Sequence, residues 1–90
     1  MEWIPGTPLI EIYPNPSHDQ FYIRMDGLSD TPVLIYIINT VGEVTLSEVI
    51  DHLSSPQILK MDLSQNPGGV YFLIIKTNDE MIFKKIILLR

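Results

Sequence analysis

The chain has 90 residues, 46% of them apolar, which suits a single domain built around one hydrophobic core. It contains no cysteine, so a disulfide scaffold, a thiolate metal site and a thiol nucleophile are all excluded. The formal charge of −5, with only six basic residues, argues against a nucleic-acid partner, because phosphate binding depends on clustered Lys and Arg.

The two ends of the chain give the expected domain organisation. No stretch approaches the roughly 20 apolar residues of a membrane-spanning helix, and the first residues lack the basic and then apolar pattern of a signal peptide. Residues 1–8, which include Pro and Gly, are interpreted as a linker remnant with Met1 as an expression start. Residues 9–90 then form one domain, which we interpret as the C-terminal piece of a larger protein.

The first predicted strands lie on either side of a stiff corner. Leu9–Tyr13 is a short strand that ends at Tyr13-Pro14-Asn15-Pro16, because proline cannot donate to a strand ladder and disfavours helix before it. Gln20–Asp26 alternates apolar and polar residues, as a strand with one buried face does. Its predicted inward residues are Phe21, Ile23 and Met25.

The middle of the chain predicts a central strand followed by a turn. Val33–Asn39 is apolar almost without interruption, which is typical of a strand covered on both faces. We expect Ile35 and Ile37 to point inward, and Gly42 to mark the turn that follows.

The next two predicted strands differ in regularity. Glu43–Ile50 places Val44 and Leu46 on one face, but Val49 is out of phase, which indicates a bulge or an early strand end. After residue 56 the alternation is regular again, and its predicted inward residues are Leu59, Met61 and Leu63.

The last two predicted strands form an antiparallel pair. Val70–Thr77 and Met81–Leu89 are separated by Asn78-Asp79, whose residue types tolerate tight turns. With turn signals every 8 to 12 residues and about seven strands in all, the pattern predicts an all-β, immunoglobulin-like antiparallel β-sandwich. Tyr71, following the Pro67-Gly68-Gly69 turn, stands where a tyrosine corner is expected, although the Cys-Trp-Cys pattern of true immunoglobulin domains is missing.

The sequence contains no recognisable set of catalytic or metal-binding residues, and we expect neither enzyme activity nor a cofactor. His18 and His52 are isolated loop residues, and no Ser has a partnered histidine or a Gly-x-Ser-x-Gly elbow. Gly68-Gly69 has no helix after it to form a phosphate loop. The only ion site left open is the turn Asp26–Asp30.

Aromatic and basic residues leave two alternatives open. Trp3, Tyr13, Tyr22 and Tyr36 would form a carbohydrate platform only if their rings were coplanar and exposed. Three of the six basic residues fall in the last seven positions, at Lys84, Lys85 and Arg90. Charges on a terminal edge strand protect it against pairing. The same unpaired edge also suits strand addition to a receptor or to a second copy as an edge-strand dimer, and the sequence does not separate these uses.

Five motifs in chain order resemble the type A C-terminal sorting domain of Bacteroidetes proteins exported by the type IX (Por) secretion system. The resemblance extends over about Leu9 to Arg90, with two departures, because Asp19 and Asn66 stand where the family often has Gly and Leu. The motifs are Tyr13-Pro14-Asn15-Pro16, Phe21-Tyr22-Ile23, Asn39-Thr40-Val41-Gly42, Leu63 to Tyr71 with its Pro67 and Gly69, and Lys84-Lys85-Ile86-Ile87.

The resemblance implies a non-catalytic secretion signal carried behind an upstream cargo domain. Its implied partners are the outer-membrane translocon and a sortase-like cysteine protease, which removes the domain and can attach the cargo to anionic lipopolysaccharide. The implied route passes through the periplasm to the outer-membrane surface or the medium. On this interpretation the cut falls in or before Trp3 to Pro8, and the translocon recognises the end of the chain. The recognition residues implied are Lys84, Lys85, Ile86, Ile87 and Arg90.

Two rival hypotheses remain. One is an immunoglobulin- or fibronectin-like accessory module that binds carbohydrate or another protein. The other is a structural spacer between domains, which we disfavour because the sequence stops with its last predicted strand.

Overall fold

The computed structural model describes residues 8–28, 32–52, 56–78 and 80–90, and within these ranges it consists of seven strands without a helix. The strands are β1 (Leu9–Tyr13), β2 (Gln20–Asp26), β3 (Val33–Ile38), β4 (Val44–Ile50), β5 (Gln57–Asp62), β6 (Gly69–Lys76) and β7 (Met81–Leu88). They match the predicted strands to within one or two residues at each end.

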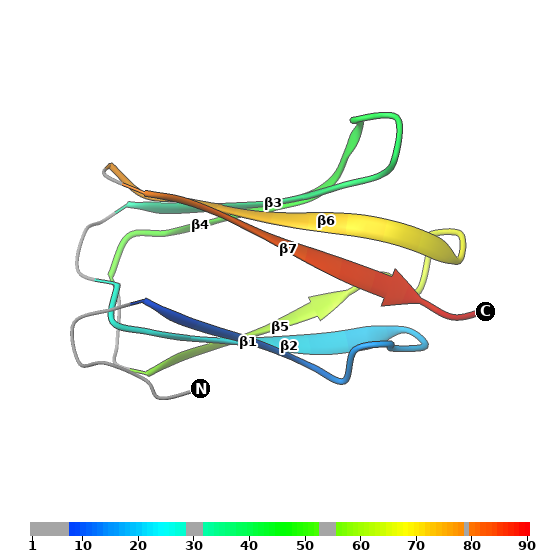
Figure 1. Ribbon diagram of the computed structural model, residues 1–90, viewed down its shortest axis with the longest axis horizontal. Helices are drawn as coiled ribbons and strands as arrows, with labels where there is room; N and C mark the ends of the chain where they lie inside the picture. The colour runs from blue at the N-terminus through cyan, green and yellow to red at the C-terminus, as the bar shows by residue number, and fades with distance from the viewer. Residues whose placement is uncertain (1–7, 29–31, 53–55, 79) are drawn as a thin grey trace.

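The strands form two antiparallel sheets that lie face to face (Figure 1). One sheet has the order β1-β2-β5 and the other the order β4-β3-β6-β7. The predicted fold class, an all-β antiparallel sandwich, is confirmed, and β6 and β7 are antiparallel neighbours as expected. This topology makes β1 and β7 edge strands on the same side of the sandwich (Figure 1).

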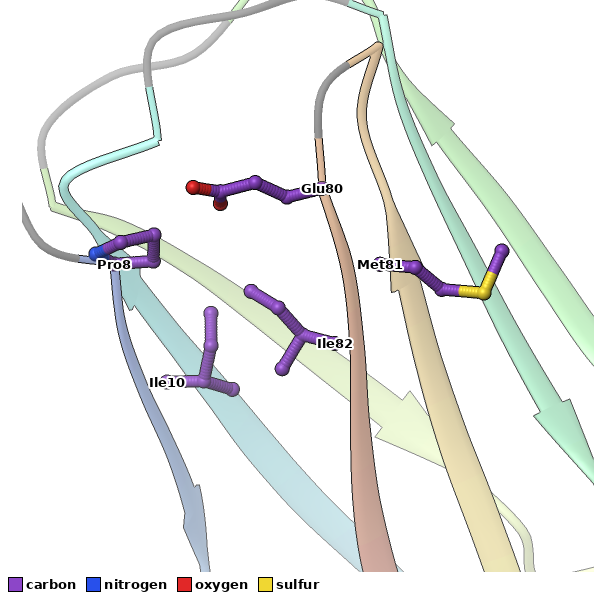
Figure 2. Close-up of a pocket in the computed structure, with 5 residues that line it drawn as sticks. All are labelled: Pro8, Ile10, Glu80, Met81 and Ile82. Carbon is purple, nitrogen blue, oxygen red and sulfur yellow. The ribbon is translucent and has the colours of Figure 1, made fainter.

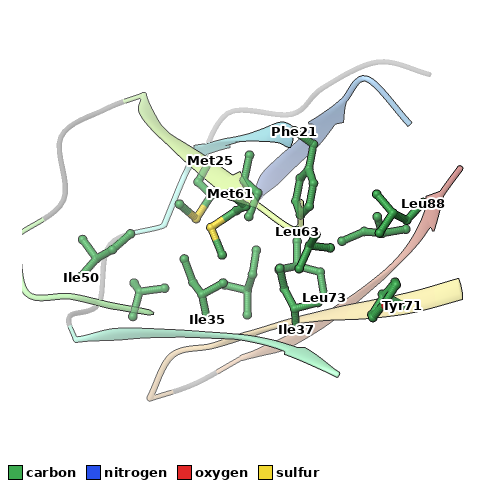
Figure 3. Packing of buried hydrophobic residues seen from close by; sticks show 14 residues of the cluster. Phe21, Met25, Ile35, Ile37, Ile50, Met61, Leu63, Tyr71, Leu73 and Leu88 are labelled. Carbon is green, nitrogen blue, oxygen red and sulfur yellow. The ribbon is translucent and has the colours of Figure 1, made fainter. Parts of the chain in front are cut away.

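The core fills the space between the sheets, as period-two alternation requires. The predicted inward residues of β2 and β3 are almost fully buried, as are Leu73 and Ile75 of β6, the neighbour of β3 in the four-stranded sheet. Figure 3 shows Phe21 and Met25 of β2 on the opposite side of the core from Ile35, Ile37 and Leu73. Each such side chain contributes roughly 1.5–3 kcal/mol through burial. The buried apolar residues are Phe21, Ile23, Met25, Val33, Ile35, Ile37, Ile50, Met61, Leu63, Tyr71, Leu73, Ile75, Ile86 and Leu88.

The irregular strand β4 contains the expected bulge, but its position differs from the prediction. Leu46 pairs with Ile37, whereas Val44 pairs with the next residue, Ile38, so Thr45 is the extra residue. Val44 is 58% exposed while Leu46 packs against the core, and the two do not share a buried face as predicted. The Thr45 hydroxyl donates to the Ile37 carbonyl, which satisfies a polar group at the bulge.

Two turns owe their shape to single residues. In the β3–β4 hairpin the Asn39 side-chain oxygen accepts the N–H groups of Val41 and Glu43, so Asn39 ends β3 one residue earlier than predicted. Gly42 has φ 89°, a left-handed conformation that favours glycine. Before β6, the Tyr71 hydroxyl donates to the Pro67 carbonyl, which is the hydrogen bond of a tyrosine corner.

Candidate functional site

The strand β7 is held on one side by β6 along its whole length, from Met81 opposite Lys76 to Leu88 opposite Gly69. Even-numbered residues of β7 face the core, where Ile86 and Leu88 are buried. Lys84 shares this inward phase and is nevertheless exposed, so it places a charge at the open side of the sandwich. Inward-facing charge of this kind discourages a foreign strand from pairing at an edge.

The other side of β7 is held by the Tyr13–Pro16 corner over its second half. The Asn15 side-chain amide donates to the Lys85 carbonyl at 2.9 Å, and its oxygen accepts the Ile87 N–H at 3.0 Å. A primary amide carries a donor and an acceptor, as a peptide unit does, so one side chain substitutes here for a neighbouring strand.

Ser17 continues the same contact through its backbone. Its N–H donates to the Ile87 carbonyl at 3.0 Å, and its carbonyl accepts the Leu89 N–H at 2.8 Å, which forms a parallel bridge with Leu88. The Ser17 side chain is 1% exposed and its hydroxyl has no hydrogen-bond partner in the structure. The backbone of Ser17 therefore makes the contact, and its hydroxyl does not contribute.

Arg90 ties the residue after this bridge to two other loops. Its guanidinium donates to the Asp19 carboxylate, to the Leu63 carbonyl and to the Asn66 carbonyl. The two departures from the family pattern, Asp19 and Asn66, thus both contact Arg90. The Asn66 contact uses a backbone oxygen that any residue offers, so only Asp19 contributes by its side chain. We call the residues Asn15, Ser17, Asp19, Leu63, Asn66 and Arg90 the β7 clamp.

The second turn motif also packs against the β7 clamp. A Cβ atom built on Gly68 would lie 2.6 Å from the Arg90 Cγ and 2.9 Å from its Cβ, so glycine gives Arg90 the room to reach Asn66. Gly69 has φ 147°, in the region that L side chains rarely adopt. The sequence placed the two turn motifs some 50 residues apart, and the fold brings both to the end of β7.

The residues predicted for translocon recognition differ in accessibility. Lys84, Lys85 and Arg90 are exposed, Ile87 is half-buried, and Ile86 is fully buried in the core. The Gly42 hairpin does not belong to the β7 clamp. It lies beside the Pro67–Gly69 turn, and together they line a pocket of about 330 Å³.

The described residues contain no group of three or more His, Cys, Asp or Glu that could hold a metal ion. Asp26 accepts the Gly27 N–H and approaches Arg24 at 3.9 Å, while Asp30, at the other end of the suggested ion site, lies outside the described residues. The pKa of Asp62 is lowered, chiefly by the Ser64 backbone N–H that its carboxylate accepts at 2.8 Å. This bond shapes the turn that presents the Leu63 carbonyl to Arg90.

The aromatic residues do not form the flat platform that carbohydrate binding would need. Tyr13 and Tyr22 stack on each other, with ring centroids 5.7 Å apart and an angle of 26°, so they cover each other's faces. Tyr36 belongs to the other sheet. Trp3 lies outside the described residues, as do the other residues expected to form the linker, except Pro8.

An open pocket of about 430 Å³ lies between the starts of β1 and β7 (Figure 2). Pro8, Ile10 and Ile82 give it apolar walls, and Glu80 is the acidic side chain among its described lining residues. These described residues place no base or nucleophile beside the carboxylate, so they make no catalytic set. In the described ranges no helix is long and apolar enough to cross a membrane.

Comparison with known proteins identifies one family. The family model for the secretion system C-terminal sorting domain matches residues 11–89, which is nearly the whole chain. No curated protein matches the chain.

Proposed function

Because the chain belongs to the family of secretion system C-terminal sorting domains and is therefore a signal for type IX secretion, we propose that β7 and its flanking charges are the element that the outer-membrane translocon recognises. The family's domains are not catalytic, which agrees with the lack of a catalytic set in the sequence. The cargo is the protein that carries this domain, and the signal directs its export through the outer membrane.

The observation that supports this proposal is the convergence of both turn motifs on β7. Asn15 bonds the backbone on both sides of Ile86, and Gly68 leaves the space that Arg90 occupies. Neither turn supports chemistry of its own. Their common effect is to fix one stretch of backbone while the ammonium groups of Lys84 and Lys85 stay exposed beside it.

We further propose that a sortase-like cysteine protease removes the domain after export from the periplasm, by a cut upstream of β1. The cargo is then released or joined to anionic lipopolysaccharide at the surface. The pleated β1 strand is paired with β2 over its full length, from Leu9 opposite Asp26 to Tyr13 opposite Tyr22, and so is a poor substrate for a protease that needs extended free backbone.

Export is tested by fusing residues 9–90 to a reporter that is targeted to the periplasm of a host with the type IX machinery. We expect reporter activity in the medium or at the cell surface, and retention when residues 84–90 are deleted. A reporter that stays in the periplasm, while a known sorting domain exports it, contradicts the proposal.

Point variants separate recognition from folding. The double substitution Lys84→Gln and Lys85→Gln removes two exposed charges and no buried contact, so the domain should unfold at the same temperature and be exported less. Lys60→Gln, an exposed lysine of β5 on the other sheet, is the matched control and should be exported normally. Equal export of all three proteins would show that the two lysines are not recognised.

Cleavage is tested on the exported fusion, built with residues 1–90 so that the linker is included. We expect its intact mass to correspond to a cut before residue 9, and the uncut mass in a host whose sortase-like cysteine protease is inactivated. A cut within β1 or β2 would contradict the proposed position.

A further inference from the structure

The outer faces of the two sheets differ in composition. The three-stranded sheet is largely polar outside, where Arg24 pairs with Glu11 at 2.9 Å and Lys60 and Asp62 are exposed. The four-stranded sheet is largely apolar outside, where its polar side chains in the described strands are Ser47, Lys76 and Lys85. In Figure 1 no other strand covers that face.

The strand registers show which side chains share this second surface. Leu34 is opposite Val49 on one side and Lys76 on the other, Tyr36 is opposite Ile74, and Ile74 is opposite Phe83. Period-two alternation extends these rows along each strand. We define the apolar face by its members, which are Leu34, Tyr36, Ile38, Val49, Val70, Phe72, Ile74, Met81, Phe83 and Ile87.

Several side chains of the apolar face are more than half exposed to water, which is unfavourable for apolar groups. Phe83 is 60% exposed, Val49 57% and Met81 52%, and the other members are half-buried. Scattered exposed apolar residues are normal, but a continuous patch over four strands marks an interaction site. Exposed strands with such faces otherwise risk aggregation.

The charged side chains of the apolar face indicate what kind of partner binds there. These side chains are Lys76 and Lys85, and neither has an ion-pair partner among the described residues. The described residues of the face include no carboxylate, so two copies packed face to face would bring these lysines together without a described acidic side chain to balance them. An anionic membrane would be repelled by the formal charge of −5.

We infer that the apolar face is a second docking surface for the export machinery. Its partner is a protein surface of that machinery, which carries apolar side chains and has carboxylates opposite Lys76 and Lys85. This inference rests on the proposed function, but it extends the recognised surface beyond β7, across β6 and β3 to β4. Val49 lies on β4, at the opposite edge of the sheet from β7. If the export machinery recognised β7 alone, a substitution at Val49 would not change export.

The main test measures export of the reporter fusion with Val49→Ser. The matched control is Ile58→Ser, because Ile58 is 52% exposed on β5 of the other sheet. We expect Val49→Ser to lower the exported fraction about tenfold, the usual effect of truncating an interface anchor, and Ile58→Ser to leave it unchanged. Thermal unfolding of both purified domains establishes that each is folded.

The outcomes of this test separate the two proposals. If the unmodified fusion is not exported, the proposed function itself fails. If it is exported and Val49→Ser is exported equally well, only the inference about the apolar face is overturned.

The charge part of the inference is tested by Lys76→Glu, with Lys60→Glu as the matched control on β5. We expect export to fall about tenfold for Lys76→Glu alone, because a new carboxylate would then face the carboxylate of the partner. Equal export of the two variants would show that the partner surface has no carboxylate opposite Lys76.

The occupant is identified by a photo-crosslinking amino acid placed at position 49 or, for comparison, at position 58 of the exported fusion. We expect an adduct with an outer-membrane component of the export machinery from position 49 only. An adduct between two fusions, or sedimentation of the purified domain as a dimer that Val49→Ser dissociates, would assign the apolar face to a second copy and overturn the inference. Flotation with phosphatidylglycerol vesicles would assign it to lipid.

Discussion

The two halves of β7 belong to one edge strand but are held in different ways. In the described part of the chain, residues 81–84 are hydrogen-bonded by β6 alone, whereas residues 85–88 lie between β6 on one side and the Asn15 side chain and Ser17 backbone on the other. The position of a strand in a sheet therefore does not settle how exposed its backbone is. Here a loop from the opposite end of the chain covers half of an edge.

The side from which the corner binds follows from strand geometry. The groups concerned point away from β6: the Lys85 carbonyl and the Ile87 N–H meet Asn15, whereas the Ile87 carbonyl and the N–H of Leu89, which follows β7, meet Ser17. Phe83 has the same phase, but the contacts of the corner end at Lys85. The first half of β7 is thus the part that could still accept another strand, and there Lys84 opposes it.

The largest difference between the halves should appear in the core. Ile86→Ala removes a fully buried side chain and should lower the free energy of unfolding by about 2–5 kcal/mol. Ile82→Ala, on the same face of β7 but only half-buried, should cost less than half as much. Urea denaturation of both variants measures this, and equal losses would contradict a difference in how the halves are packed.

Removing the side chain that covers the edge should have the next largest effect. Asn15→Ala deletes two hydrogen bonds to β7 and should cost about 1–3 kcal/mol, with faster hydrogen exchange at the Ile87 amide. Asn15→Asp keeps the acceptor for Ile87 and loses the donor to Lys85, so it should leave the Ile87 amide protected. If both variants expose that amide equally, the Asn15 oxygen is not its partner.

Gly68→Ala tests the contact between the second turn and Arg90. The new methyl group would overlap Arg90, and the cost should be about 1 kcal/mol, the lower end of the range for overpacking, because the arginine is exposed and can move. The penalty should become smaller when Arg90→Ala is already present, because that change removes the Cγ atom at 2.6 Å and keeps only the Cβ atom at 2.9 Å. A double-mutant cycle in thermal unfolding measures this coupling, and additive effects would argue against the contact.

Ser17→Ala should have almost no effect, or a stabilising one of up to about 1 kcal/mol. The hydroxyl is buried without a partner, so removing it relieves a desolvation cost, while the backbone bonds to Ile87 and Leu89 remain. A clear loss of stability in urea denaturation would mean that the hydroxyl has a partner, such as a bound water.

One predicted effect depends on pH. The pKa of Asp62 is lowered below its ordinary value of 3.8 by the Ser64 N–H, so its ionised form is favoured in the folded state. Its contribution should be complete above that ordinary value and be lost as the pH falls through the folded pKa. Asp62→Asn should therefore melt at a lower temperature than the unmodified domain at pH 7, and the two curves should converge in acid.

The sequence was sufficient to predict the strands, their inward faces and the fold class, because alternation and turn residues are local signals. The bulge in β4 was expected, but its position at Thr45 was not, since a bulge is fixed by the register against β3. Asn15 was interpreted only as part of a stiff corner. Its contact with β7 depends on a partner 70 to 72 residues away, and no local pattern encodes that pairing.

The Arg90 contacts were missed for a related reason. In the sequence Asp19 is only a departure from the family pattern, whereas in the fold it is an ionic partner 71 residues from Arg90. The signal present in this sequence is an acidic residue, Asp19, shortly after the Pro14-Asn15-Pro16 corner, together with Arg90 at the basic end.

The long sequence separations within the β7 clamp have a consequence for the time at which the domain folds. The side chains of Asn15 and Asp19 obtain these partners only after residues 85–90 have been synthesised, and contacts of this range also form slowly. The fold is therefore complete only once residues 85–90 are present. A polypeptide interrupted before Lys85 leaves the corner without its strand, so a fully folded domain is a physical sign that translation has reached the last residues of the signal.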